Sequence, residues 1–182
     1  MAAVAAHRVS TDVAYPWDQG SKALSADELK RREAWQSRFM PSGAMVAGRV
    51  DRLHWMTFGT PETLPLLYSE QPPLMTKGRQ QAVVRVGALQ SDSQATEAQT
   101  INWSTAPRGT AVSVRMSGLL WPEAAARITN SAYITRERVG KGQVILFSGQ
   151  PNFRGSTRGV GRVWLNALVY GPGLGTSAQV EL

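Results

Sequence analysis

The sequence predicts an α/β (or α+β) domain in which a mixed β-sheet is flanked by helices and the middle portion is β-rich. Three features point to this fold class. A capped amphipathic segment begins at residue 26, short β-favouring runs follow, and a strand, a Gly-rich connection and a helix come in that order near residue 160. At 182 residues, one domain with its own core is expected.

The first helix is predicted over residues 26–39. Ser25 and Glu28 stand at the two positions of a capping box, in which the serine hydroxyl accepts a backbone N–H bond and the glutamate reaches back to the cap. Trp35 and Phe39 are four residues apart and therefore share one helical face. The segment should be amphipathic.

The middle of the chain is predicted to form strands because β-favouring residues come in short runs. Gly59, the Pro72-Pro73 pair and Gly78 separate these runs. The stretch 90–107 is rich in Gln, Ser and Thr and has little to bury, so we predict a long exposed loop there. The strands predicted in this part are 44–50, 53–58, 64–68 and 82–89.

Regular structure is predicted again from Thr110. Val112, Val114 and Met116 alternate with polar residues, which is the period of a half-buried strand. The Val-Ile-Leu-Phe run at 144–147 is apolar on both faces and predicts a central strand that is covered on both sides. The other elements predicted here are a helix over 123–129 that starts near Pro122, a strand over 132–139, and a tight turn at Gly140-Lys141-Gly142 before a strand over 143–147.

A Gly-rich connection over 148–159 leads to the last predicted helix, from about Val160 to Tyr170. Gly171 and Pro172 should stop this helix. The predicted organisation is a poorly ordered N-terminal arm (1–24), a single α/β domain (25–172) and a flexible tail (173–182).

Composition excludes several classes of site. The chain has no Cys, which rules out disulfides, thiolate zinc sites and a cysteine nucleophile, and its two His residues are too few for a His-rich metal site. The formal net charge is +7, and 16 of the 20 basic residues are Arg. These residues are scattered, so we expect a basic surface or an acidic partner rather than nucleic-acid binding. The longest apolar run has six residues, whereas a membrane span needs about 20.

One loop has the composition of an anion site. Asn152, Arg154 and Arg158 are the candidate ligand-binding residues, because amides and the helix dipole at the start of the last helix favour an anion and the arginines add charge. The alternative is that Arg154 pairs with an internal acid and locks the loop. His54, within an apolar segment, is interpreted as a satisfied core or surface residue. No catalytic or metal-ligating residue is predicted, since a serine nucleophile would lack a base.

Several short blocks, in order and spacing, resemble the C-terminal region of bacterial zinc carboxypeptidase-like proteins. In that family a carboxypeptidase A-like catalytic domain is followed by a domain similar to class I glutamine amidotransferases. The resemblance covers roughly residues 25–172 and implies a partial domain of that amidotransferase-like fold. The blocks are Trp35 to Ala44, His54 to Gly59, Ser117 to Glu123, Gly140 to Phe147, Pro151 to Gly155 and Leu165 to Leu168.

The resemblance implies a parent metallocarboxypeptidase, periplasmic or secreted, that acts in proteolysis. The family's His-x-x-Glu zinc pair and the amidotransferase cysteine are missing here, so this chain should hold no cofactor, and zinc is expected only in the parent's catalytic domain. The expected function is that of a non-catalytic C-terminal accessory domain, or a fragment, of a zinc carboxypeptidase-like protein, which packs on the catalytic peptidase domain or helps to position substrate.

Two expectations separate this function from its rival, a free-standing module that binds a peptide or another anion at the Asn152–Arg158 loop. A docking domain should expose a large apolar patch, whereas a binding module should have a concave site near Arg154. Core packing is favoured for Trp35 and Trp164. The tryptophans that could anchor an interface are Trp35, Trp55, Trp103, Trp121 and Trp164.

Overall fold

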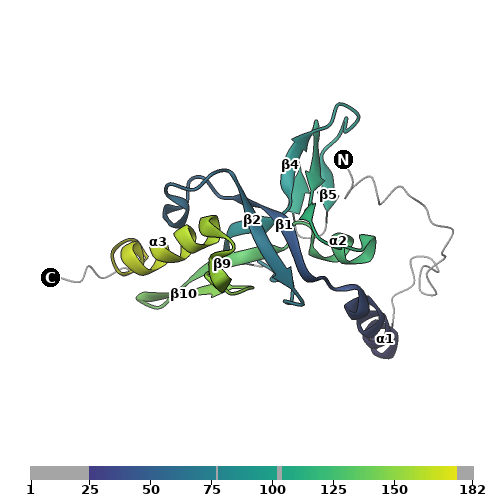
Figure 1. Cartoon of the computed structure of the whole chain (residues 1–182), viewed down its shortest axis with the longest axis horizontal. Coiled ribbons are helices and arrows are strands. Elements are labelled where there is room, and N and C mark those ends of the chain that lie inside the picture. Colours follow the sequence, from purple (N-terminus) through teal and green to yellow (C-terminus); the bar gives the residue numbers. More distant parts are fainter. Residues whose placement is uncertain (1–24, 77, 102–103, 176–182) are drawn as a thin grey trace.

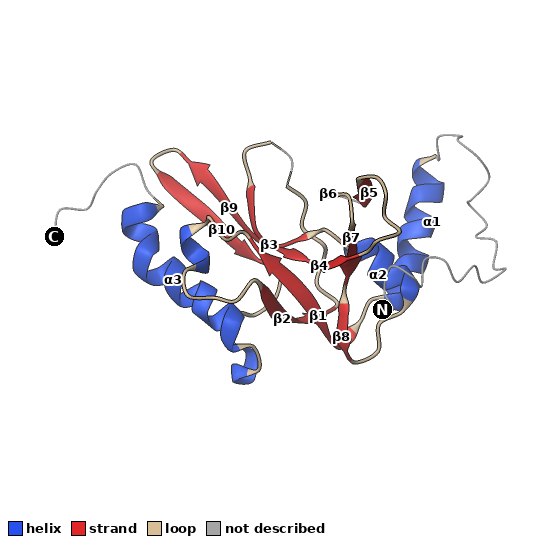
Figure 2. Ribbon diagram, turned by 90° about the horizontal axis from the view of Figure 1, so that it is seen from above, coloured by secondary structure: helices blue, strands red, loops and turns tan. Residues whose placement is uncertain are grey.

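The computed structural model describes residues 25–76, 78–101 and 104–175, and it shows a mixed α/β protein with a curled antiparallel sheet (Figures 1 and 2). The largest sheet has the strand order β10-β9-β3-β1-β2, and β8 also pairs with β1. The predicted arm (1–24) and residues 176–182 of the predicted tail lie outside the described residues. The helices are α1 (Ala26–Gln36), α2 (Pro122–Ile128) and α3 (Arg158–Leu174). The strands are β1 (Ser42–Val50), β2 (Thr63–Ser69), β3 (Gln81–Val86), β4 (Ala88–Ser91), β5 (Gln99–Ile101), β6 (Ser104–Ala106), β7 (Thr110–Ser113), β8 (Arg115–Ser117), β9 (Ala132–Val139) and β10 (Gly142–Phe147).

The predicted mixed β-sheet is wrong, because every pair of named strands is antiparallel. Strand β9 turns directly into β10 through the predicted Gly140–Gly142 turn, so this connection needs no crossover helix. Figures 1 and 2 both show α3 near the β10 end of the molecule and α1 and α2 at the opposite end.

The capping box at the start of α1 is confirmed. Ser25 Oγ accepts a hydrogen bond from the Glu28 backbone N–H at 3.3 Å, and the Ser25 N–H donates to Glu28 Oε2 at 2.7 Å. A 3-10 turn over Ser37–Phe39 follows the helix, so the predicted helix over 26–39 is confirmed apart from a tighter last turn.

Helix α1 buries none of its residues fully, and a few side chains attach it to α2. The Phe39 ring lies 4.5 Å from that of Trp35 and 6.1 Å from that of Trp121, measured between centroids. Glu33 forms an ion pair with Arg127 of α2. The fixed position of this helix therefore depends on its C-terminal half.

The predicted strand over 82–89 breaks at Gly87. This glycine has φ +99°, and a Cβ there would lie 2.3 Å from Val112 Cγ1, so the chain turns out of β3 and begins β4. The predicted loop over 90–107 is wrong in part, since β4 extends to Ser91 and β5 and β6 form a small hairpin. Its residues are mostly exposed, as expected, but Ala95 and Ala106 are buried.

Strand β10 is an edge strand among the described strands, which overturns the prediction of a central strand over 143–147. Ile145 and Phe147 pack on the core. Val144 and Leu146 point to the other face and are 45% and 51% exposed. Local hydrophobicity could not distinguish these two environments, because a fully apolar run fits an edge as well as a centre.

Helix α3 is longer than the predicted segment 160–170 and continues through Gly171 and Pro172 to Leu174. Two side chains from the sheet satisfy carbonyl groups at its end: Gln143 Nε2 donates to Gly171 O at 3.1 Å, and Arg136 Nη2 donates to Gly175 O at 3.0 Å. These bonds stabilise the last turn, because they give a second donor to Gly171 O, which also accepts the Gly175 N–H at 2.9 Å, and a donor to the carbonyl of the C-cap residue Gly175.

The core lies between the sheet and the segments that cover it. Val160 and Val163 of α3 are buried against β2, whose Leu64 and Leu66 are fully buried. Val112 and Val114 are buried as the alternation predicted, whereas Met116 is 51% exposed. The other large members of the core cluster are Val46, Met56, Tyr68, Val83, Val84, Val86, Ile128, Tyr133 and Ile134.

Candidate functional site

The loop predicted to bind an anion is exposed. Asn152, Arg154 and Arg158 all lie on the surface, where Phe153–Gly155 forms a 3-10 turn and Arg158 begins α3. Arg154 has φ +48°, and its guanidinium carbon lies 5.3 Å from the centroid of the Phe153 ring. Among the described residues, no carboxylate pairs with Arg154, so the alternative in which an internal acid locks this loop has no support. Ligand binding at the three residues stays a prediction.

A second group of residues, which the sequence did not assign to a site, surrounds His54. The predicted strand over 53–58 is wrong, since residues Trp55–Thr57 form a 3-10 turn. The Thr57 hydroxyl lies 2.6 Å from Asp51 O and 2.7 Å from His54 O and shares its one proton between them, and the His54 N–H donates to Asp51 O at 3.1 Å. These local bonds compete with strand pairing and favour the turn.

Helix α3 holds this turn in place. The side chain of Asn166 is buried, and its Nδ2 donates to Met56 O and to Phe58 O, both at 2.8 Å. The Trp55 side chain is partly buried against the core. The backbone that carries His54 is therefore fixed by hydrogen bonds from an element more than 100 residues away.

Strand β9 contributes Arg136, which is only 9% exposed. Its guanidinium is held by three oxygen atoms, all of them neutral. Burial lowers the pKa of Arg136, and the like charge of Arg138 lowers it further. The acceptors are Gln143 Oε1 at 2.9 Å, Gln81 Oε1 at 3.1 Å and Gly175 O at 3.0 Å.

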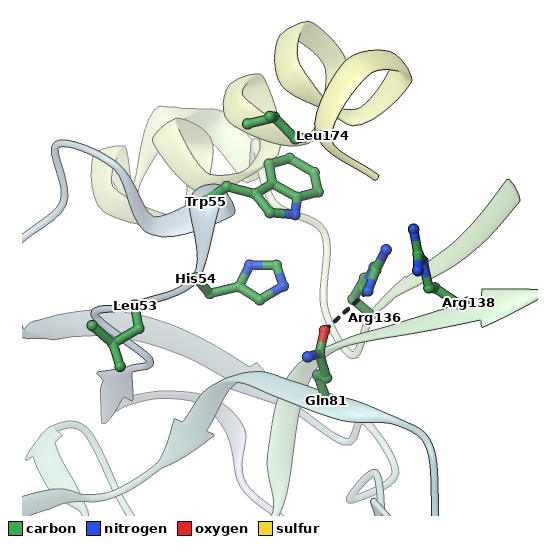
Figure 3. A pocket seen from close by; sticks show the side chains of 7 residues that line it. All are labelled: Leu53, His54, Trp55, Gln81, Arg136, Arg138 and Leu174. Atoms are coloured by element: carbon green, nitrogen blue, oxygen red, sulfur yellow. Dashed lines mark hydrogen bonds between the residues drawn. The ribbon is translucent and has the colours of Figure 1, made fainter. Parts of the chain in front are cut away.

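These elements enclose a solvent-open pocket of about 420 Å³, drawn in Figure 3. The aromatic wall is Trp55, and the charged groups are the guanidinium groups of Arg136 and Arg138. None of the lining residues is acidic. The lining residues are Leu53, His54, Trp55, Gln81, Arg136, Arg138 and Leu174.

His54 is the most buried polar residue of this pocket, with 7% of its surface exposed. Its ring is tilted against that of Trp55, with centroids 5.4 Å apart. Burial lowers the pKa of His54 and Arg136 lowers it further, whereas Asp51 and Gln81 act in the opposite direction. Its Nδ1 accepts a hydrogen bond from the Met56 N–H at 3.2 Å, but its buried Nε2 has no hydrogen-bond partner among the described residues.

The outer side of α3 is the second surface of interest. Leu165, Leu168 and Val169 are 48%, 56% and 67% exposed, and their spacing places them on one face. Arg158 and Arg162 continue the same face toward the helix N-terminus and are exposed. We call these five residues the α3 face. Helix α3 contains no Asp or Glu.

The tryptophans named as interface anchors have different environments. Trp35 and Trp164 are only partly buried, so neither is a core residue. Trp121 is 49% exposed, next to Phe39, and Trp55 lines the pocket. Trp103 lies outside the described residues.

Neither a metal cluster nor a membrane span is found in the described part of the chain. There, no three His, Cys, Asp or Glu residues lie close enough to hold a metal ion. No helix among residues 25–175 has the length and hydropathy to cross a membrane. No protein-family model, no curated protein and no solved structure matches the chain.

Proposed function

We propose that the chain is a non-catalytic accessory domain that docks through the α3 face onto a partner with an apolar surface edged by carboxylates. The single observation that carries this proposal is the exposed group Leu165, Leu168 and Val169 on one side of a well-packed helix. Aliphatic side chains gathered on one face are typical of protein interfaces, whereas scattered ones are ordinary on a surface.

The charge of the α3 face defines the partner. Arg158 and Arg162 lie beside the apolar residues, and neither takes part in a salt bridge between described residues. Because the helix carries no acidic residue and the chain has a net charge of +7, a basic surface would be repelled. Carboxylates at the rim of a partner would pair with these arginines and fix its orientation.

The resemblance in the sequence identifies the partner that we favour, the carboxypeptidase A-like catalytic domain of a zinc carboxypeptidase-like protein. On this proposal the parent acts in proteolysis, and this chain supplies neither zinc ligands nor a nucleophile. A partial class I glutamine amidotransferase-like fold is the finer part of the same proposal. The blocks Pro151 to Gly155 and Leu165 to Leu168, which carry the resemblance, contribute to the loop before α3 and to its outer face.

Titration of the purified chain with a bacterial zinc carboxypeptidase domain of the resembled family tests this function. We expect saturable binding in biolayer interferometry that weakens as salt is raised, because charged pairs at a rim are screened. Leu168→Asp should reduce affinity by about tenfold or more, as expected for an apolar contact at the centre of an interface. Leu119→Asp is the matched control, since Leu119 is also exposed, at 70%, but lies outside the α3 face.

Three results would contradict the proposal. These are absence of binding, equal loss of affinity in the two variants, and self-association of the chain through the α3 face that Leu168→Asp abolishes. Circular dichroism of each variant must match the parent chain, so that a change in affinity reports on the surface and not on unfolding.

A further inference from the structure

The side chains that line the pocket of Figure 3 carry more hydrogen-bond donors than acceptors. Nδ1 of His54 accepts the Met56 N–H, so this nitrogen carries no proton. In the neutral ring the proton is therefore on Nε2, which makes Nε2 a donor. That donor is buried and unpartnered among the described residues, although buried donors almost always have an acceptor.

The other polar groups of the pocket are donors as well. Arg136 uses three of its five N–H groups on neutral oxygens, so two remain. Gln81 Oε1 accepts from Arg136 and is also the neutral acceptor that raises the pKa of His54, so the group that Gln81 has left is its amide N–H₂. Arg138, two residues along β9 on the same face, adds an exposed guanidinium.

The acid that acts on the pKa of His54 does not supply the missing acceptor. Asp51 is close enough to influence His54 electrostatically, but it is not among the residues that line the pocket. Its Oδ1 accepts the Leu53 N–H at 3.0 Å. Among the described residues, the pocket thus presents two positive charges and several donors with no negative charge to balance them.

From this arrangement we propose that the pocket binds a small organic oxyanion, a carboxylate or a phosphate monoester, that carries an apolar group. The oxyanion lies between His54 Nε2 and the guanidinium groups of Arg136 and Arg138, which match its geometry and charge. Its apolar group rests against Trp55, with Leu53 and Leu174 at the sides. The volume of about 420 Å³ is within the range of small-molecule sites. This site is separate from the α3 face, so the two proposals can fail independently.

Binding is tested on the full chain with four probes: phenylacetate, phenyl phosphate, acetate and benzyl alcohol. Isothermal titration should show binding of phenylacetate or phenyl phosphate, weaker binding of acetate, and none of benzyl alcohol. If phenylacetate binds more tightly, the ligand is a carboxylate; if phenyl phosphate binds more tightly, it is a phosphate monoester. Failure of both aromatic anions to bind, or equal binding of benzyl alcohol, overturns the proposal.

Paired variants of His54 separate the role of Nε2 from the structural role of Nδ1. His54→Asn keeps an acceptor at the Nδ1 position for the Met56 N–H but removes the Nε2 donor, whereas His54→Gln keeps a donor near Nε2. We expect His54→Asn to weaken binding by about tenfold or more, and His54→Gln to restore part of the affinity. Equal affinity of both variants and the parent chain would exclude Nε2 from the site.

A variant of Arg138 tests the site without disturbing the core, because this side chain is exposed. Arg138→Gln should weaken anion binding by about tenfold, since a hydrogen bond to a charged group is lost at an exposed residue. Arg108→Gln removes the same charge from the exposed turn between β6 and β7, outside the pocket and the α3 face, and should leave the affinity within about twofold of the parent value. Equal losses in the two variants would mean that net charge, and not this pocket, attracts the anion.

A spectroscopic readout tests the tautomer directly. In long-range ¹H–¹⁵N spectra, His54 should show a bare Nδ1 and a protonated Nε2, and the Nε2 resonance should shift as phenylacetate is added. With only two histidines in the chain, His54→Asn assigns the signal. A proton on Nδ1, or an Nε2 resonance unmoved at saturation, would refute the geometry proposed here.

Discussion

Replacement of Asn166 tests how α3 holds the turn that carries His54. Its Nδ2 donates two hydrogen bonds of 2.8 Å, to Met56 O and Phe58 O, and the side chain is 5% exposed. At about 0.5–1.5 kcal/mol for each net hydrogen bond, Asn166→Ala should lower the free energy of unfolding by about 1–3 kcal/mol. For a chain of this length, that corresponds to a decrease in Tm of about 2–12 °C.

Urea unfolding followed by far-UV circular dichroism measures this loss. Asn152→Ala is the matched control, because the Asn152 side chain is exposed and should change stability by less than about 0.5 kcal/mol. Asn166→Asp should be less stable than Asn166→Ala at neutral pH, since a carboxylate would face two carbonyl oxygens. If Asn166→Ala lost no more stability than the control, the turn would not depend on α3.

Three further predictions concern the sheet, the histidine and the end of α3. Gly87→Ala should lower the free energy of unfolding in urea by about 2–5 kcal/mol, because φ is +99° and the new Cβ would overlap Val112. Gly109→Ala is the control: its φ is also positive, but the new Cβ would lie in open space, so the loss should be only about 1–2 kcal/mol. The pKa of His54 is lower in the folded than in the unfolded state, so the unfolded chain binds more protons as pH falls below about 6.5, and stability should fall there and level off below the folded-state pKa. Unfolding free energies between pH 5 and 8 should show this dependence in the parent chain and not in His54→Asn. Gln143→Ala should speed amide hydrogen exchange in the last turn of α3, where Gln143 donates to Gly171 O; unchanged protection would exclude this capping role.

The sequence predicted best those elements that nearby residues determine. The capping box at Ser25 and Glu28 set the start of α1, and the Gly140–Gly142 turn set the β9–β10 hairpin. Predictions failed for features that are determined by residues far away in the sequence. The end of α3 depends on Gln143 and Arg136 of the sheet, and the position of β10 at an edge depends on which strands pair.

The residues that line the pocket could not be predicted from the sequence for a related reason. The apolar residues around His54 favour a strand in the sequence, and an isolated histidine in an apolar run gives no sign of its partners. Gln81, Arg136 and Leu174 come from three other elements, so no local spacing joins them. The combination of Asp51 with Thr57 was the one available sign of a turn in place of a strand, because both can bond locally to backbone.

The position of β10 at the rim of the sheet has a consequence for the behaviour of concentrated solutions. Among the described strands, none pairs with the outer edge of β10, so its main-chain N–H and C=O groups could pair with a second chain, and the apolar side chains of Val144 and Leu146 would strengthen such a contact. The excess of positive charge keeps molecules apart at low ionic strength. Salt shortens the range of that repulsion, so edge-to-edge aggregation of the chain should increase in storage buffers of moderate ionic strength.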